Sequence, residues 1–293
     1  MTLRQLDVFV AVADHGGFGA AAGALGMSQS SVSHALASLE AAVGGDLVAR
    51  ATPVRPTALG EVLLPHARAT LAAARSLTAA AAAHTRAATS GTISLSVPPT
   101  VARGLLPGLL RLWHERLPHL EITVFEAVDE EIHQWLESGT VDAAFLIDPD
   151  PLPHGALHVA TDVYEAVVRA DHPLAGEDVI DLADLLEDPL LVTTSGFEPP
   201  LRRLHALADL PYRPARRIRE LMTLLSMVEA GIGVGVLPSL AASMLSDTLT
   251  LVPLRPRQER KLVLTGPTAR PWHPSVLAIR DLTEAAGRAS SVG

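Results

Sequence analysis

The second part of the chain, from about residue 92, alternates strand-like and helix-like segments in two series, and no other feature constrains the fold as strongly. The first series runs "TISLSV", "VARGLLPGLLRLWHERL", "LEITVFEA", "EEIHQWLESG" and "VDAAFLI". After Thr161 the second series runs "LLVTTS", "PPLRRLHALADL", "ELMTLLSMVEAG" and "VGVLP". Strands that alternate with helices favour parallel β-α-β units. We therefore expect an α/β domain over residues 91–293 with a cleft between two hinged lobes, lobe I holding residues 91–161 and 267–293 and lobe II residues 162–266.

The first 45 residues predict three short helices separated by glycine-containing turns. The first ends at "HGGF", the second runs through "GAAAGAL", and Ser28 is an N-cap candidate for the third, which continues to Gly44-Gly45. Two extended stretches, "DLVAR" and "VRPTAL", follow and suit a small β wing. We interpret residues 1–58 as a helix-turn-helix domain with a wing.

From Ala58 to about Thr89 the chain is almost continuous helix former, and Thr57 is a candidate cap. Small and apolar residues recur three and four apart, as in a coiled-coil seam. The seam consists of Leu64, Ala67, Leu71, Ala74, Thr78 and Ala81. Because nothing local buries this seam, we interpret residues 59–90 as a linker helix that pairs with a second copy of the chain. A core helix of the following domain is the alternative.

The third helix begins with "SQSSVSH", a run of polar side chains that are mediocre helix formers. Hydroxyl, amide and imidazole groups at the start of a recognition helix suit base edges, and the helix N-terminus favours a phosphate. The candidates for base or backbone contact are Gln29, Ser30, Ser33 and His34, with Ser28 and Ser31 assigned to capping or phosphate contact. A solvent-exposed polar face is the alternative.

Charge, cysteine content and the length of apolar runs exclude several classes of function. The formal charge of −9 excludes coating of nucleic acid by bulk attraction, so DNA contact must be local. The absence of cysteine removes disulfides, thiolate zinc sites and thiol redox chemistry. Apolar runs are too short for a membrane span, which needs about 18 residues, and the N-terminus does not resemble an export signal. We expect a cytoplasmic protein with no membrane partner.

The run "LRQLDVFVAVADHGGFGAAAGALGMSQSSVSHALASLEAAVGGDLVAR" and the later "GIGVGVLP" resemble the LysR-type transcriptional regulators. The resemblance implies a winged helix-turn-helix, a dimerising linker helix and a periplasmic-binding-protein-like effector domain, usually in tetramers. It also implies DNA contact by Arg50 and Arg55 of the wing. The sequence departs from the family pattern in helix three, where Ser30 stands in place of the usual Pro and His34 in place of a basic residue. In the wing, Val48 replaces an aromatic residue and Pro56 an apolar strand residue. These departures concern which operator sequence is bound and not the DNA-binding role.

Ligands of two-lobed α/β proteins bind beyond the carboxyl ends of the strands. Such ends occur at "SVPPT", "FLIDPD", "VTTSGF" and "RELMT". Together with the family resemblance they predict an effector site formed by Pro99, Thr100, Thr194, Ser195 and Thr223. Arg103, Arg202 and Arg203 are further candidates. The alternative for each hydroxyl is a bond to its own backbone. The pair Pro98-Pro99 removes two amide donors from the mouth, which argues against a strongly anionic effector.

These features predict a sequence-specific DNA-binding transcriptional regulator whose activity responds to a small molecule in the cleft. The expected partners are double-stranded operator DNA, a small-molecule effector and other copies of the chain in a homodimer or homotetramer. RNA polymerase is a further candidate. Without a serine elbow, a phosphate loop or a histidine pair at metal spacing, we expect no catalysis, cofactor or metal. The alternative is a solute-binding protein without a regulatory role, which would not need residues 1–90.

Overall fold

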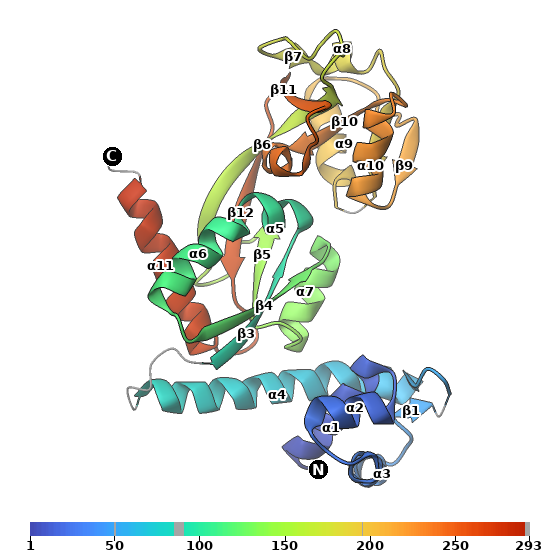
Figure 1. Ribbon diagram of the computed structural model, residues 1–293, viewed down its shortest axis with the longest axis vertical. Helices are drawn as coiled ribbons and strands as arrows, with labels where there is room; N and C mark the ends of the chain where they lie inside the picture. The colour runs from blue at the N-terminus through green and yellow to red at the C-terminus, as the bar shows by residue number, and fades with distance from the viewer. Residues whose placement is uncertain (50, 85–90, 195, 291–293) are drawn as a thin grey trace.

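The computed structural model describes residues 1–49, 51–84, 91–194 and 196–290. A small helical domain lies beside one end of a long helix, and two α/β lobes are stacked on the other side of that helix (Figure 1). This order along the chain agrees with the predicted fold class, an N-terminal helix-turn-helix followed by a linker helix and a two-lobed α/β domain.

The N-terminal domain contains the three predicted helices, α1 (Leu3–His15), α2 (Phe18–Leu25) and α3 (Gln29–Val43). Helix α3 begins at the predicted cap, because the Ser31 amide donates to the Ser28 hydroxyl oxygen over 3.2 Å. The turn before it contains Gly26 at φ 60°, a left-handed conformation that glycine adopts without strain. Val8, Phe9, Val12, Val32 and Leu36 form the centre of the core that holds the helices together.

The wing consists of β1 (Val48–Ala49) and β2 (Arg55–Pro56), which pair antiparallel as predicted. Glu40 of α3 fixes its start, since the Glu40 Oε1 accepts a hydrogen bond from the Leu47 amide at 2.9 Å. The wing is therefore attached directly to α3.

Helix α4 (Ala58–His84) follows the wing, and its first turn is capped by Thr57, whose hydroxyl oxygen accepts from the Gly60 amide at 3.0 Å. The prediction that nothing local buries its seam is wrong for the first half. Leu64, Ala67 and Leu71 pack into the core of the N-terminal domain, because α1 lies along this part of α4. Thr78 and Ala81 are exposed, and residues 85–90 lie outside the described part.

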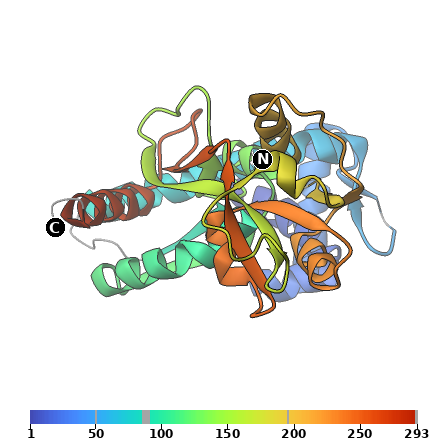
Figure 2. The same cartoon turned by 90° about the horizontal axis from the view of Figure 1, so that it is seen from above.

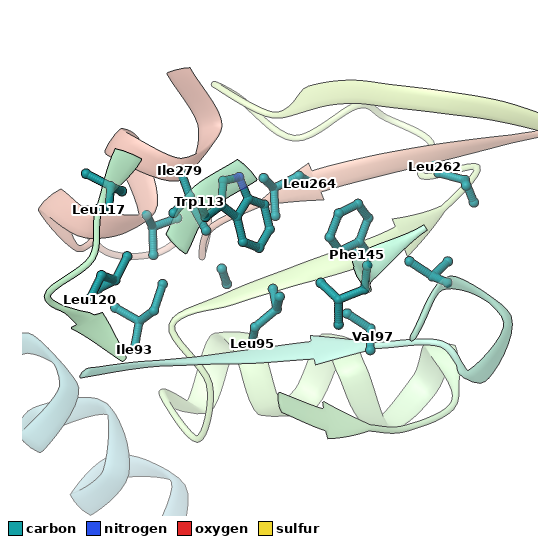
Figure 3. Packing of buried hydrophobic residues seen from close by; sticks show 14 residues of the cluster. Ile93, Leu95, Val97, Trp113, Leu117, Leu120, Phe145, Leu262, Leu264 and Ile279 are labelled. Atoms are coloured by element: carbon teal, nitrogen blue, oxygen red, sulfur yellow. The ribbon is translucent and has the colours of Figure 1, made fainter. Parts of the chain in front are cut away.

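Lobe I contains a parallel sheet in the order β4-β3-β5, with helices on both faces. Its elements are β3 (Gly91–Val97), α5 (Pro99–Gly104), α6 (Leu106–Arg116), β4 (Leu120–Glu126), α7 (Asp129–Ser138) and β5 (Ala143–Ile147), joined by β12 (Glu259–Thr265) and α11 (Pro274–Ser290). The C-terminal helix α11 runs beside α6 and also contacts α4 (Figure 2). Trp113 and Phe145 are the largest side chains of the core between sheet and helices (Figure 3), and the Trp113 indole donates to the Thr283 hydroxyl at 2.9 Å.

Lobe II repeats this arrangement, with parallel strands in the order β9-β8-β10. Its elements are β7 (Ile180–Asp181), α8 (Leu182–Leu185), β8 (Leu190–Thr193), α9 (Glu198–Leu207), β9 (Arg216–Ile218), α10 (Leu221–Glu229), β10 (Val234–Pro238), the 3-10 helix η1 (Ser239–Met244) and β11 (Leu249–Arg255). The two series of alternating segments in the sequence are thus two copies of one topology.

Two long antiparallel strands connect the lobes. Strand β6 (Leu157–Arg169) pairs with β12 through its first half and with β10 and β11 through its second half. Residues 262–265 of β12 pair with β5 of lobe I. The chain therefore returns to lobe I between β11 and β12, around residues 256–258, and the predicted return at 266 is wrong because β12 belongs to the lobe I sheet.

Lobe I sits on the linker helix through the end of α7. Gly139 terminates α7 at φ 77°, and a Cβ atom placed there would lie 2.7 Å from the Ala72 Cβ of α4. Only a glycine allows both this backbone conformation and this approach. The lobe and the linker helix are consequently in direct contact at a point where no side chain fits.

Candidate DNA-binding surface and effector cleft

The predicted DNA contacts of α3 are all exposed. Ser28, Gln29, Ser30, Ser31, Ser33 and His34 lie in the first turns of α3 or at its cap. Ser30, Ser33 and His34 are spaced i, i+3 and i+4, so they occupy one side of the helix. Helix α3 lies on the face of the N-terminal domain turned away from α4 and the lobes (Figure 1). This side of α3 is therefore exposed to solvent.

The serines divide into two groups by their hydrogen bonds. The Ser28 hydroxyl lies 3.0 Å from the Ser30 hydroxyl and 2.7 Å from that of Ser31, and it caps the helix. The side chains of Gln29, Ser33 and His34 have no hydrogen-bond partner among the described residues. These side chains are available to a ligand without breaking an internal bond.

Positive charge on this domain is sparse. Arg55 is exposed on β2, and Arg50 lies outside the described residues. Arg68 forms an ion pair with Asp14. Within the described part of residues 1–68, Arg4 and Arg55 are thus the arginines without an acidic partner.

A cleft lies between the lobes where the carboxyl ends of the parallel strands meet. Its larger cavity has a volume of about 490 Å³ and its smaller one about 250 Å³, and the two share Val128 and Thr194. The segments after β3, β4 and β5 of lobe I and those after β8 and β9 of lobe II line these spaces. Cavities of this size suit a small molecule.

The structure brings some of the predicted effector contacts to this cleft and not others. Pro99 and Thr194 line it. Thr100 is fully buried, and its hydroxyl oxygen accepts from Nη1 and Nη2 of Arg260, both at 3.2 Å. Thr223 is exposed on α10 but does not line either cavity, which residues 219–222 line instead. Ser195 lies outside the described residues.

A buried ion pair between Arg260 and Asp162 lies at the bottom of the cleft. Arg260 Nε and Nη2 donate to the two carboxylate oxygens of Asp162, each at 2.7 Å, and the exposed fractions of the side chains are 2% and 6%. The Leu240 amide also donates to Asp162 at 3.4 Å. Arg260 and Asp162 lie on the two strands that cross between the lobes. Arg260 also binds Thr100 on α5 of lobe I, and Asp162 binds Leu240 on η1 of lobe II. The ion pair therefore connects both lobes to the crossing strands.

Two family models match the chain. The model described as bacterial regulatory helix-turn-helix protein, lysR family, matches residues 3–61, and the model described as LysR substrate binding domain matches residues 86–288. The chain belongs to the LysR family of transcriptional regulators. It is therefore a DNA-binding transcriptional regulator with an effector-binding domain, as the sequence predicted.

Similarity to other bacterial regulators extends over most of this LysR-family chain. The uncharacterized HTH-type transcriptional regulator YvbU of Bacillus subtilis (strain 168) is 31% identical over 246 residues, 83% of this chain and 83% of its own. A probable hydrogen peroxide-inducible genes activator of Mycobacterium avium is 36% identical over 245 residues, 82% of this chain and 78% of its own. The similarity covers both the DNA-binding and the effector-binding parts.

Solved structures of LysR-family proteins share the whole architecture. A cysteine variant of full-length OxyR from Pseudomonas aeruginosa superposes with a TM-score of 0.74 at 25% identity, covering 97% of this chain and 94% of its own. Full-length CbnR, whose structure was solved in complex with its target DNA, superposes with a TM-score of 0.71 at 23% identity. The superposition covers 98% of this chain and 100% of the CbnR chain. At that identity the likeness concerns the fold.

Sequence reasoning missed several residues of the LysR-family cleft. Residues 126–128 line it at the end of β4. The sequence does carry a signal for them, because "LEITVFEA" predicts a strand that ends there. Tyr164 and Arg260 also line it. They carry no local signal, because they reach the cleft only through the pairing of β6 with β12.

Of the three arginines proposed to reach a ligand, Arg103 and Arg203 line the cleft. Arg202 instead pairs with Glu198 at 2.8 Å and stacks over the Tyr212 ring at 4.4 Å. Burial, reinforced by the Glu198 charge, raises the pKa of Tyr212 to about 12. Nearer the hinge, burial and then the Asp162 charge raise the pKa of Glu165. Tyr212 and Glu165 therefore remain protonated to higher pH than usual.

Neither a membrane-spanning helix nor a metal cluster is found in the described part of the chain. No helix there is long and apolar enough to cross a bilayer. No group of three histidine, aspartate or glutamate side chains there has the geometry to hold a metal ion.

Proposed function

We propose that residues 1–58 recognise an operator through the exposed side of α3. Gln29, Ser30, Ser33 and His34 contact base edges, Ser28 and Ser31 cap the helix and face phosphate, and Arg50 and Arg55 of the wing contact the backbone. The observation that carries this assignment is that Gln29, Ser33 and His34 are exposed and their side chains have no internal hydrogen-bond partner in the described structure.

The interlobe cleft is the proposed effector site. Pro99 and Thr194, which line it, support this assignment, and residues 219–222 line it in place of Thr223. Ser195, outside the described residues, remains a proposed contact. Thr100 supports the site indirectly, because its hydroxyl positions the Arg260 guanidinium. Residues 59–90 serve as the linker helix, and the effector domain extends from residue 91, with lobe I resuming at about residue 259.

Regulation follows from the contacts of lobe I with the linker helix. An effector that binds both lobes favours their closed arrangement. Closure changes how α7 and α11 press on α4, and in a homodimer or homotetramer this shifts the spacing of the DNA-binding domains on their half-sites. Altered spacing bends promoter DNA and changes access for RNA polymerase. The protein acts in the cytoplasm as a regulator and not as an enzyme.

The regulatory signal is a bound molecule and not oxidation of a thiol. One relative is named a hydrogen peroxide-inducible genes activator, and the OxyR structure is that of a cysteine variant. This chain has no cysteine. Thiolate oxidation, disulfide formation and sulfenic acid chemistry are therefore closed to it.

Selection of genomic fragments by the purified full-length protein tests the regulatory function. We expect enrichment of fragments that share a dyad-related motif, because a symmetric oligomer binds symmetric half-sites. A protein with the exposed control substitutions Thr123→Ala and His154→Ala should enrich the same fragments. Enrichment that shows no common motif at any salt concentration would contradict operator recognition.

A further inference from the structure

The charged side chains of the cleft are unevenly divided between the lobes. Among the described residues, lobe I lines it with the carboxylates of Glu126, Glu131 and Asp148 and with one guanidinium, that of Arg103. Lobe II lines it with the guanidiniums of Arg203 and Arg219 and one carboxylate, that of Glu220. Four carboxylates thus face three guanidiniums. The cleft has an acidic lip and a basic lip and no excess of positive charge, so its field does not favour an anion.

Two of the helix starts that face the cleft, those of α5 and α9, lack amides that hold anions elsewhere. Pro98 is the N-cap of α5 and Pro99 its first residue, and Pro199 and Pro200 occupy the second and third positions of α9. These residues line the cleft and have no N–H group. At these two helix starts a carboxylate cannot be bound by main-chain donors in the usual way. A carboxylate placed there is left to side-chain guanidiniums.

Arg260 is not available for this purpose. Its guanidinium lines the smallest space of the cleft, but Asp162 accepts from it twice at 2.7 Å and neutralises it. In contrast, Arg103, Arg203 and Glu126 have no side-chain hydrogen-bond or ion-pair partner among the described residues. Both signs of unpaired charge are therefore present in the adjoining cavities.

Apolar side chains line the same cavities as these charges. They are those of Val128, Ile147, Tyr164, Phe197, Leu221, Met222 and Met244. Methionine adapts to varied apolar shapes, and Tyr164 and Phe197 offer aromatic faces. The apolar lining suits a hydrocarbon or aromatic body.

We infer that the effector is a zwitterion with an apolar body, of the chemical class of a free amino acid with an apolar side chain. This inference rests on the proposed use of the cleft as the effector site. The ammonium group faces Glu126 of lobe I, and the carboxylate faces Arg203 of lobe II. A ligand with both charges binds both lobes and stabilises their closure, whereas a ligand with one charge binds one lobe.

Calorimetric titration of the full-length protein tests the inference. The probes are the apolar L-amino acids and, for the tightest of them, its methyl ester, which keeps only the positive charge, and its N-acetyl derivative, which keeps only the negative charge. We expect saturable binding of the amino acid and at least about tenfold weaker binding of each derivative. A derivative that binds as tightly as the amino acid, or the absence of binding by every apolar amino acid, would overturn the inference.

Two variants assign the charges to the lobes. Glu126→Gln should weaken the amino acid and the methyl ester by about tenfold and leave the N-acetyl derivative unchanged. Arg203→Gln should do the reverse. The controls Glu115→Gln and Arg213→Gln change exposed residues that do not line the cleft, and they should leave all affinities unaltered. Equal losses for all three ligands in either cleft variant would contradict the assignment.

A further variant separates failure of the inference from failure of the proposed site. Thr194→Trp fills the space shared by the two cavities. If a singly charged derivative binds best and Thr194→Trp abolishes its binding, the cleft is the effector site and the zwitterion inference alone is wrong. If the bound ligand keeps its affinity in Thr194→Trp, the proposed site itself is wrong.

Discussion

The DNA-binding surface and the effector cleft are built in opposite ways. The polar side of α3 comes from one short run, residues 28–34, in which every residue except Val32 is exposed and which one helix supports. The cleft combines segments that range from residue 98 to residue 260, and its floor depends on an ion pair between residues 98 positions apart in the chain. A surface of the first kind can be recognised from local sequence, whereas one of the second kind exists only once two strands have paired.

The strongest test of this difference is the hinge ion pair. Asp162→Asn leaves the buried Arg260 guanidinium without its counter-charge, which should lower the free energy of unfolding by about 3–5 kcal/mol. Denaturant titration measures this loss. As a control, Glu259→Gln breaks the exposed Arg257–Glu259 pair at the start of β12 and should cost less than about 1 kcal/mol. Equal costs at both sites would show that the hinge does not depend on the buried pair.

The contact of lobe I with α4, which joins the two regions, can be tested at Gly139. Gly139→Ala places a methyl group against Ala72 and forces a left-handed residue to carry a side chain, so we expect a loss of about 1–3 kcal/mol in unfolding free energy. The matched control is Gly108→Ala in α6, where nothing lies within 4 Å of the added Cβ. That substitution should be neutral or stabilising by up to about 1 kcal/mol. If Gly139→Ala behaves like this control, α7 does not pack on α4 as described.

The sparse charge of the DNA-binding domain predicts weak dependence of operator affinity on salt. With Arg68 paired to Asp14, two or three phosphates are neutralised per domain. At about 0.9 per phosphate, the logarithm of the association constant of a dimer should fall by about 4 to 5 for each tenfold rise in salt. Fluorescence anisotropy with operator DNA in increasing KCl measures this slope. A slope steeper than about eight would mean that another basic surface joins the contact.

The smallest expected effect is on acid stability. Burial lowers the pKa of His205 and of His273 below the usual value of 6.5. Below about pH 6.5 the unfolded chain therefore binds more protons at these histidines than the folded protein does. The free energy of unfolding falls as the pH drops below about 6.5, by less than about 1.4 kcal/mol per pH unit for each histidine. His205→Gln and His273→Gln should each reduce the loss between pH 7.5 and 5.5, measured by denaturant titration. The exposed control His154→Gln should lose as much stability as the parent protein, and an unchanged loss in the two buried variants would refute this origin.

Local signals predicted much of the fold. Ser28 and Thr57 cap the helices assigned to them, the wing strands pair, and the strand and helix segments named from residue 92 onward appear in order. The one helix expected over "VARGLLPGLLRLWHERL" is two helices, α5 and α6. The sequence did not predict the antiparallel strands β6, β11 and β12. The other errors concern tertiary placement. The burial of the first half of the α4 seam depends on α1, and the position of β12 in lobe I depends on pairing with β5.

The candidate sites follow the same division. For α3 the structure describes every residue named from the sequence, and all are exposed. For the cleft, Pro99 and Thr194 line the cavities, but Thr100 turns to Arg260 and Thr223 lies elsewhere. Position after a strand places a residue near the cleft, yet the direction of its side chain depends on neighbours that local sequence does not reveal. Their roles in DNA and effector binding stay predictions.

Footprinting of the selected operator is the most direct test of the central claim that the exposed side of α3 reads the DNA. The full-length protein should protect two dyad-related half-sites. A protein with Ser33→Ala and His34→Ala should bind at least about tenfold more weakly, because each lost base contact is worth about 1–3 kcal/mol, and it should keep the same oligomer size. An unaltered footprint and affinity in this double variant would contradict the claim.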